Sequence, residues 1–189
     1  MMSALELLVS AALESECERV LIALDGRAAS GKTTLADAFE KRLDCNVFHL
    51  DDFFLRPEQR SPERLLTPGE NVDHERFVVE VMMPLLSGKE FSYRPFSCST
   101  MTLGDPVAVT PKRINLIEGA YACHPSLFDA YTHRFFLTVS PEEQLFRIAQ
   151  RNASSLEAFK SRWIPLEEAY FKAYDLMSRT VVIKNENNR

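Results

Sequence analysis

The segment GRAASGKT at residues 26–33 limits what this chain can fold into more than any other feature. It matches the pattern G-x-x-x-x-G-K-[ST], the P-loop that binds phosphate groups. An apolar run of strand length, residues 19–24, comes before it, and an amphipathic stretch, residues 34–43, follows it as a helix would. Strand, loop and helix in this order are the context in which the motif binds phosphate, so we expect a phosphate-binding site here.

The residue types in this loop suit a bound triphosphate. Glycines allow successive N–H groups to point at one anion, and the N-terminus of the following helix adds partial positive charge. Lys32 can reach the β- and γ-phosphates, and the Thr33 hydroxyl can join a magnesium shell. The nucleotide-binding residues expected from this segment are Gly26, Arg27, Ala28, Ala29, Ser30, Gly31, Lys32, Thr33 and Thr34.

Composition narrows the class of protein. A chain of 189 residues with 46% hydrophobic and 26% charged residues suits a single globular domain over residues 1–189. The net charge of −5 argues against a nucleic-acid backbone as partner, and no stretch is long and apolar enough to span a membrane. The four cysteines are scattered without a CxxC pair, and the N-terminus lacks the features of a signal peptide. Reduced thiols and a cytoplasmic location are therefore expected.

Apolar strands alternate with helical patterns along the chain. This alternation predicts an α/β fold in which a parallel sheet carries helices on both faces. The five strands expected are residues 19–24, 46–50, 113–117, 133–139 and 180–184. The helices expected, besides the one after the P-loop, cover residues 4–16, 73–87, 126–130, 141–151, 155–163 and 165–177.

Other segments have less regular patterns. Residues 56–71 are rich in Pro, Glu and Arg without a clear period, which predicts a loop. Residues 91–96 and 107–109 suit a hairpin or two short strands. The helix within residues 1–18 is expected either to pack or to meet a partner, and the sequence leaves a homo-oligomer open.

Two further strand ends carry acidic residues. In open α/β sheets, ligands bind at the carboxyl ends of the strands, where the P-loop also lies. A phosphoryl transfer needs a group that accepts the proton of the attacking hydroxyl and a carboxylate that holds Mg²⁺. Asp51, the first polar residue after its strand, is the expected base, and Asp52 can share the metal or cap a turn. Glu118 stands where a Walker-B acid would stand, although each segment can also be an ordinary strand end in solvent.

Together these motifs resemble those of the uridine kinase and phosphoribulokinase family of P-loop kinases. The segments that carry the resemblance are the P-loop, HLDDFF at residues 49–54, NVDHERF at residues 71–77, Tyr93, and IEG at residues 117–119. Their order and approximate spacing match over residues 19–184. The resemblance implies a P-loop NTPase fold with a five-stranded parallel sheet and a helical lid. It also implies transfer of phosphate from ATP, with Mg²⁺, to a hydroxyl of a small molecule.

The resemblance implies roles for the matching residues. Asp51 aligns with the aspartate that activates the acceptor hydroxyl and lies near the metal, and Thr33 and Glu118 align with the other magnesium-linked residues. Asp73 aligns with an aspartate that holds ribose hydroxyls, and Tyr93 with an aromatic residue beside the nucleoside. Asp73 can also be a helix cap, and Tyr93 a plain core residue. The residues expected to bind the acceptor are Asp51, Phe54, Asp73, Tyr93 and Arg162.

Kinases of this kind close an arginine-bearing helical lid over the phosphates, here expected over about residues 141–165. Arg147 and Arg151 lie four residues apart on one predicted helix and face the same way. Either can neutralise charge on the transferring phosphoryl group or lie on a solvated helix face. We expect Arg147 to be catalytic together with Asp51 and Lys32, and Arg151 to bind the nucleotide. The residues expected to hold the lid helix or its hinge are Trp163, Glu167, Glu168 and Tyr170.

Two features differ from the family's pattern. Members that act on uridine or cytidine carry a base-reading histidine shortly after the tyrosine, whereas here Tyr93 is followed by RPFSCS at residues 94–99. Loss of such a hydrogen bond changes selectivity, because buried polar groups must be paired. The lid is also shorter and poorer in arginine. Arg94 can meet an anionic acceptor or be an exposed loop charge, and His74 is expected to be structural.

The sequence therefore predicts a small-molecule kinase that uses ATP and Mg²⁺, with a uridine-like nucleoside as the leading acceptor. Pantothenate, a sugar or a sugar phosphate are alternative acceptors. A non-catalytic nucleotide-binding regulator is the alternative function, and the acidic balance disfavours an ATPase directed at nucleic acid. The choice between ATP and GTP is left open.

Overall fold

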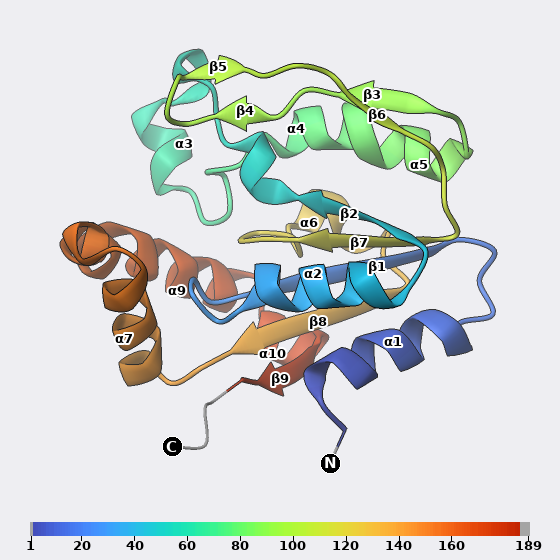
Figure 1. Cartoon of the computed structure of the whole chain (residues 1–189). Helices are drawn as coiled ribbons and strands as arrows, with labels where there is room; N and C mark the ends of the chain where they lie inside the picture. The colour runs from blue at the N-terminus through green and yellow to red at the C-terminus, as the bar shows by residue number, and fades with distance from the viewer. Residues whose placement is uncertain (1, 186–189) are drawn as a thin grey trace.

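A five-stranded parallel sheet forms the centre of the molecule (Figure 1). The computed structural model describes residues 2–185. The sheet has the strand order β2-β7-β1-β8-β9, and each neighbouring pair is parallel. Its strands are β1 (Val20–Gly26), β2 (Cys45–His49), β7 (Ile114–Glu118), β8 (His133–Thr138) and β9 (Val181–Lys184). The predicted α/β class, strand number and parallel pairing are confirmed.

Side chains of β1 alternate between two cores, because successive residues of a strand point to opposite faces. Val20, Ile22 and Leu24 belong to the core under helices α1 (Ala4–Glu14) and α2 (Lys32–Arg42). Leu8 and Ala12 of α1 are fully buried there, so this helix packs against the body of the protein.

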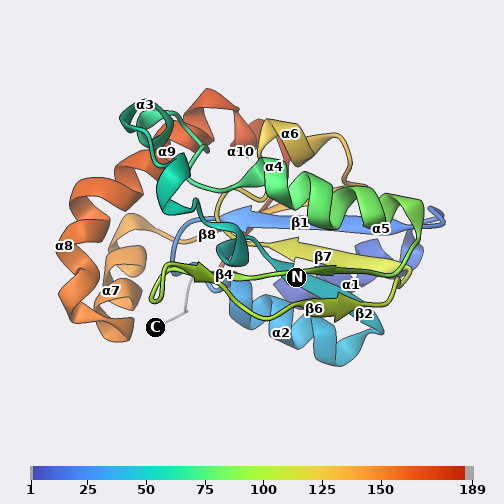
Figure 2. The ribbon, with the colours of Figure 1, turned by 90° about the horizontal axis from the view of Figure 1, so that it is seen from above.

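Leu21 and Ala23 face the second core, on the opposite side of the sheet. Its helical cover comes from α4 (His74–Phe77), η3 (Val78–Met82), α5 (Met83–Ser87), α6 (Pro125–Phe128), α9 (Ile164–Ala173) and α10 (Leu176–Arg179). Viewed from above, α4 and α5 lie along one side of the strands and α2 along the other (Figure 2). Helices on both faces are therefore confirmed.

A separate group of elements lies between β2 and β7 along the chain and stands above the sheet in Figure 1. It starts with the single turn η1 (Leu50–Phe53), which directly follows β2. Two antiparallel pairs complete it, β3 (Phe91–Tyr93) with β6 (Val107–Val109) and β4 (Phe96–Ser97) with β5 (Thr102–Leu103). The prediction of short strands is confirmed for residues 91–93 and 107–109, and the β4–β5 pair was not predicted.

The prediction of a loop over residues 56–71 was incomplete. This stretch contains η2 (Pro57–Gln59) and α3 (Pro62–Leu66). The Ser61 side chain accepts a hydrogen bond from the Arg64 N–H, and Pro62 occupies the first helical position, which are standard helix-start features. The helix is too short to produce a hydrophobic period, so only its start signal was present in the sequence.

The helix predicted after Asp73 is confirmed, with a π-helical segment in its middle. It runs as α4, η3 and α5, and Gly88 ends it in the left-handed conformation with φ +69°. The Asp73 side chain accepts a hydrogen bond from the Arg76 N–H and so caps the helix.

The predicted lid region contains α7 (Pro141–Arg151), η4 (Ala153–Ser155), α8 (Leu156–Ala158) and η5 (Phe159–Trp163). These elements project to one side of the sheet and continue into α9 (Figures 1 and 2). The helix predicted over residues 165–177 is wrong at its end, because α9 stops at Ala173 and Asp175 takes a left-handed conformation with φ +49°. No glycine or proline marked this break.

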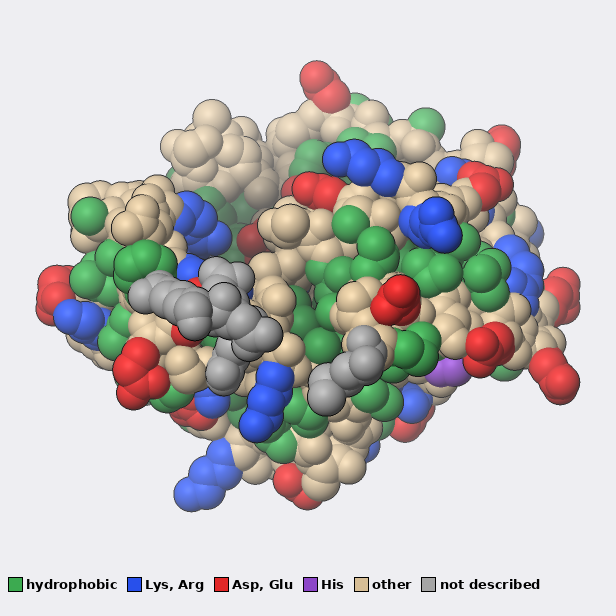
Figure 3. Space-filling view, turned by 60° about the horizontal axis from the view of Figure 1, so that its bottom comes forward, with side chains coloured by type: hydrophobic (Ala, Val, Ile, Leu, Met, Phe, Trp, Pro, Cys, Tyr) green, Lys and Arg blue, Asp and Glu red, His purple; other side chains and the backbone are tan. Residues whose placement is uncertain are grey.

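No helix in the described residues 2–185 is both long and apolar enough to cross a membrane. On the face shown in Figure 3, basic and acidic side chains are interspersed rather than gathered by sign.

Candidate active site

The P-loop connects the end of β1 to the start of α2, as predicted. Gly26 has φ +141°, and a Cβ at this position would lie 2.0 Å from the Leu137 carbonyl oxygen on β8. Only glycine fits so close to the neighbouring strand. Ala29 and Gly31 also have positive φ, of 57° and 99°, so the chain curls tightly before Lys32 opens α2.

Lys32 folds back over this curl. Its Nζ donates to the carbonyl oxygens of Gly26 and Arg27, both at 2.9 Å. The side chain is only 9% exposed, yet it lines the cavity described below. A single ammonium group is thus held at the mouth of the loop, in position to meet an anion.

Glu118 ends β7 and lies opposite His49 of β2 in the sheet register. Its Oε1 accepts a hydrogen bond from the Thr33 hydroxyl at 3.2 Å and lies 2.6 Å from His49 Nδ1. The hydrogen bond with Glu118 raises the pKa of His49, although burial acts in the opposite direction. Three strand or helix ends therefore converge on one carboxylate that is 3% exposed.

Asp51 and Asp52 follow β2 in the turn η1 but face different surroundings. Asp51 lines the cavity, and its pKa is raised by burial and by the charge of Glu118, with Lys32 acting to lower it. Asp52 accepts the hydroxyl of Tyr93, while burial raises the Asp52 pKa and also raises the pKa of Tyr93 to about 12. The two neighbouring carboxylates are thus separated, one toward the P-loop and one toward the core.

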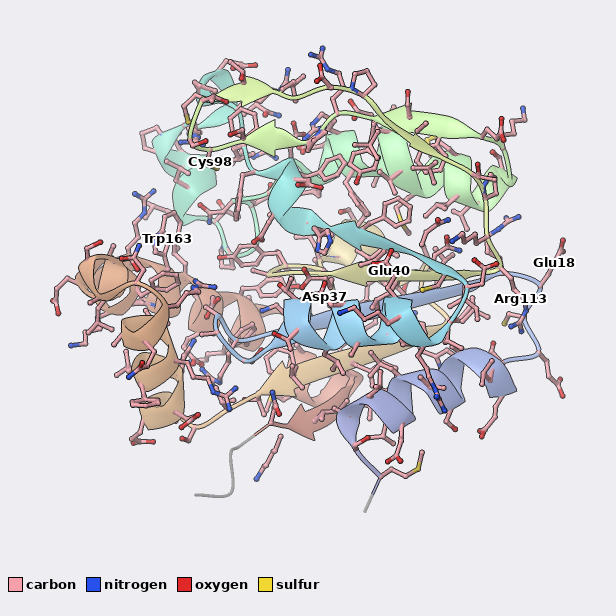
Figure 4. The ribbon with its side chains drawn as sticks, in the orientation of Figure 1. Glu18, Asp37, Glu40, Cys98, Arg113 and Trp163 are labelled. Atoms are coloured by element: carbon pink, nitrogen blue, oxygen red, sulfur yellow. The ribbon has the colours of Figure 1, made fainter. Side chains whose placement is uncertain are left out.

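A cavity of about 860 Å³ lies where these groups meet. One wall is the P-loop with the start of α2, and another is η1 with the turn after β7. The third comes from the lid region, including Trp163, whose position is labelled in Figure 4. The predicted site residues that line the cavity are Ala28, Ala29, Gly31, Lys32, Thr33, Thr34, Asp51, Phe54, Glu118, Arg147 and Arg151.

Three of the predicted acceptor residues do not line this cavity. Asp73 is 1% exposed at the start of α4, and Tyr93 packs against Phe53 with ring centroids 5.5 Å apart. The Arg162 guanidinium lies 4.5 Å from the centroid of the Trp163 ring. Gly26, Arg27 and Ser30 shape the P-loop from behind the cavity wall instead of facing it.

The lid helix α9 is fastened to the P-loop. The Ala28 N–H donates to both oxygens of Glu167, at 3.0 and 3.2 Å, and Arg27 forms an ion pair with Glu168. Burial raises the pKa of Glu167 to about 7, although Lys32 and the Ala28 N–H both act to lower it. The predicted holding role of Glu167 and Glu168 thus has a direct structural basis.

Arg147 of α7 reaches the P-loop from the lid side. Its guanidinium donates to the Ser30 carbonyl at 3.3 Å and to the Asn185 carbonyl at 2.8 Å. Its Nε pairs with Glu143 at 2.7 Å. The Asn185 side chain also donates to the Ser30 carbonyl, at 2.7 Å, so the end of the described chain contacts the same loop.

Two buried groups on the acceptor side have unused hydrogen-bonding capacity within the described residues. Asn71 Nδ2 has no partner there, and Asn71 lines the cavity. Asp73 Oδ2 likewise accepts no hydrogen bond, although Arg56 Nε and Arg76 Nε lie 3.6 and 3.5 Å away. Buried polar atoms are normally paired, so both positions are suited to receive groups of a ligand.

Comparison with known proteins places this geometry in context. Over 142 residues, 71% of this chain, the sequence is 30% identical to human nicotinamide riboside kinase 2, and the match spans 58% of the length of that protein. A protein from Bacillus stearothermophilus described as a possible uridine kinase superposes with a TM-score of 0.73 and 18% identity, over 95% of this chain and 96% of the other. This chain has a P-loop kinase fold of the uridine kinase type.

A second solved structure has the same P-loop kinase fold. It is a protein from Silicibacter named as a candidate fructose transport system kinase, with a TM-score of 0.70 and 21% identity over 97% of this chain and 98% of the other. No family model matches the chain. The fold and the resemblance to uridine kinase-like P-loop kinases predicted from the motifs are therefore confirmed.

Within this P-loop kinase fold, sequence reasoning missed several residues of the site. His49 was noted only as part of a motif, and Asp25 was not considered. Asp25 is fully buried beneath the P-loop, where it accepts hydrogen bonds from the Gly26 N–H, the Cys123 N–H and the Tyr170 hydroxyl, and burial raises its pKa. The cavity-lining residues that were not predicted to be there include Asn71, Tyr121, Phe159, Trp163, Glu167 and Asn185.

Proposed function

We propose that this chain is a kinase that transfers the γ-phosphate of ATP to a hydroxyl group of a ribonucleoside. One observation carries the proposal: Asp51 lines the same cavity as Lys32, Thr33 and Glu118. A group able to accept a proton and a loop able to hold a triphosphate therefore share one space. A nucleotide-binding regulator has no need of this combination.

The residues present fit ATP and Mg²⁺. The Ala28 N–H already holds a carboxylate, which is an anion like a phosphate oxygen, and Lys32 is aimed at the same loop. Thr33 Oγ1 and Glu118 Oε1 are oxygen atoms 3.2 Å apart, the donor type that Mg²⁺ prefers. Thr33 and Glu118, with Asp51 beside them, would hold the ion, which would neutralise charge on the phosphates.

Each chain residue then has a definite task. Asp51 accepts the proton of the attacking hydroxyl, and its raised pKa strengthens it as a base once it is ionised. Lys32 and Arg147 reduce the negative charge on the transferring group. Closure of the lid region, about residues 141–165, excludes water and so limits wasteful hydrolysis of ATP.

The acceptor side supports a ribonucleoside with a flat ring. Asn71 and Asp73 have buried polar atoms that ribose hydroxyls would pair, and Phe54, Tyr121 and Trp163 bring aromatic surface to the cavity. The lack of the pyrimidine-reading histidine after Tyr93 and the 30% identity to nicotinamide riboside kinase 2 favour nicotinamide riboside over uridine. Pantothenate, sugars and sugar phosphates offer no base for these rings.

The test is acceptor phosphorylation by purified protein with Mg²⁺ and labelled ATP. Nicotinamide riboside, uridine, pantothenate and fructose are supplied separately, and the labelled product is separated from released phosphate. We expect nicotinamide riboside to give the highest kcat/KM. Product formation with none of these acceptors above ATP hydrolysis would overturn the proposal.

The variant Asp51→Asn sharpens this test. Loss of the proton acceptor should reduce product formation by about 10²-fold or more, while the affinity for a non-hydrolysable ATP analogue changes little. Asp44→Asn is the matched control, since Asp44 precedes the same strand at its opposite end and has an exposed side chain. Full activity in Asp51→Asn would remove Asp51 from the mechanism.

A further inference from the structure

A second cluster of metal-binding side chains lies apart from the cavity. It consists of Glu70, His74 and His124, and none of the three lines the cavity. Glu70 and His74 lie on either side of the segment 71–73, whereas His124 precedes α6 after the turn that follows β7. The kinase reaction proposed above uses none of them.

The ligand atoms of this cluster are close enough to share one ion. His74 Nε2 lies 2.9 Å from Glu70 Oε2, and His124 Nε2 lies 3.5 Å from Glu70 Oε1. All three residues offer ligand atoms within 4.8 Å of one another. Ligands of a tetrahedral Zn²⁺ at about 2.0–2.1 Å from the metal are roughly 3.3 Å apart, so only small adjustments are needed.

His124 provides a second and independent observation. Its side chain is buried, with the residue 5% exposed, and Nδ1 is engaged by Ser126 Oγ at 2.8 Å. Nε2, directed at Glu70, has no hydrogen-bond partner within the described residues. A buried polar nitrogen without a partner is costly, and a metal ligand bond would remove that cost.

We propose that Glu70, His74 and His124 form a binding site for a divalent transition-metal ion of the Zn²⁺ class. Two imidazoles and a carboxylate suit Zn²⁺ or Co²⁺, with water in the fourth position, whereas Mg²⁺ prefers oxygen ligands alone. The site is therefore chemically distinct from the Thr33 and Glu118 pair.

Loading requires a local rearrangement. The rings of His74 and His124 are stacked, with centroids 4.1 Å apart and planes at 18°. Because an imidazole nitrogen binds a metal in the plane of its ring, the rings must turn out of this stack. The His74 side chain is 12% exposed, which gives it access to solvent and room to turn.

The ion would join two parts of the fold. Glu70 and His74 flank Asn71 and Asp73, and His124 lies just beyond the strand that carries Glu118. One ion would thus fix the acceptor-side segment to the sheet next to the cavity. Its function is structural, and it stands whether or not the proposed kinase activity is correct.

The experiment is titration of metal-free full-length protein with Co²⁺ in the presence of excess Mg²⁺. Four-coordinate Co²⁺ has visible absorption bands that a surface-bound hydrated ion lacks. We expect these bands to saturate at one ion per chain and to be displaced by Zn²⁺. The variants His74→Asn and His124→Asn should each weaken binding by more than about tenfold, beyond the usual effect of losing an outer-shell partner.

His133→Asn is the matched control, because His133 Nε2 is also buried without a partner but belongs to no such cluster in residues 2–185. Circular dichroism establishes that each variant is folded, and Glu70→Gln replaces any variant that is not. Absence of the visible bands in the wild-type protein would overturn the proposal. Equal binding by wild-type protein and the folded ligand variants would overturn it as well.

Discussion

Glu167 joins the acid–base behaviour of the molecule to its stability. The carboxyl group is 4% exposed, accepts the Ala28 N–H, and has a pKa raised by burial from 4.5 to about 7. The folded state thus binds a proton that the unfolded chain has already lost between these values. The stability that this group contributes is full below pH 4.5 and is lost as the pH rises through about 7.

Glu167→Gln should remove this pH dependence. Near pH 8 the variant should gain on the order of 2–3 kcal/mol in free energy of unfolding relative to the wild-type protein, with little difference near pH 5. Urea unfolding at both pH values measures the effect. Glu168→Gln is the control, since its side chain is 49% exposed. Parallel curves for wild type and Glu167→Gln at both pH values would contradict the prediction.

At the residue scale, prediction from sequence succeeded where a motif or a strand end fixes position. Lys32, Asp51 and Glu118 line one cavity because the carboxyl ends of parallel strands meet at one edge of the sheet. Asn71 and Asn185 were missed because their importance arises from contacts with distant parts of the chain. Asp25 had a local signal, an acid within an apolar strand, which indicates a buried and paired carboxylate.

At the scale of elements, α7 connects the predicted lid to the P-loop through Arg147. Arg147→Ala should lower kcat by at least about tenfold, because a cation near the transferring phosphoryl group acts mainly in the transition state. Gln150→Ala, an exposed change on the same helix, should leave kcat unaltered. Steady-state kinetics of phosphate transfer measures both. Equal kcat values for the two variants would exclude Arg147 from the reaction.

Long and periodic elements were predictable, and short ones were not. The five central strands and the helices α1, α2 and α7 have apolar patterns long enough to be read. The helix α3 and the β4–β5 pair have too few residues to form a pattern, and contacts with their surroundings decide their conformation. The break at Asp175 is of the same kind, because a tertiary contact outweighs helix propensity there.

At the scale of the whole molecule, the cavity is walled by elements from both ends of the sequence, which makes Trp163 a reporter of its state. Trp163 is the single tryptophan of the chain and lines the cavity from the predicted lid. If the lid closes on a filled site, an ATP analogue and acceptor together should change its fluorescence more than the sum of their separate effects. Titration of each ligand alone and of both measures this, with free tryptophan as the control for light absorption. Purely additive changes would argue against a closing lid.

The chain leaves the sheet after β2 and returns in β7, the strand directly beside it, so residues 50–113 form a detour between two neighbours. The register that sets His49 against Glu118 belongs to those neighbours and does not depend on what the detour contains. Such a layout separates two kinds of evolutionary change. Descendants of one ancestral gene can rewrite the detour to recognise new metabolites and still inherit the phosphate-handling apparatus intact.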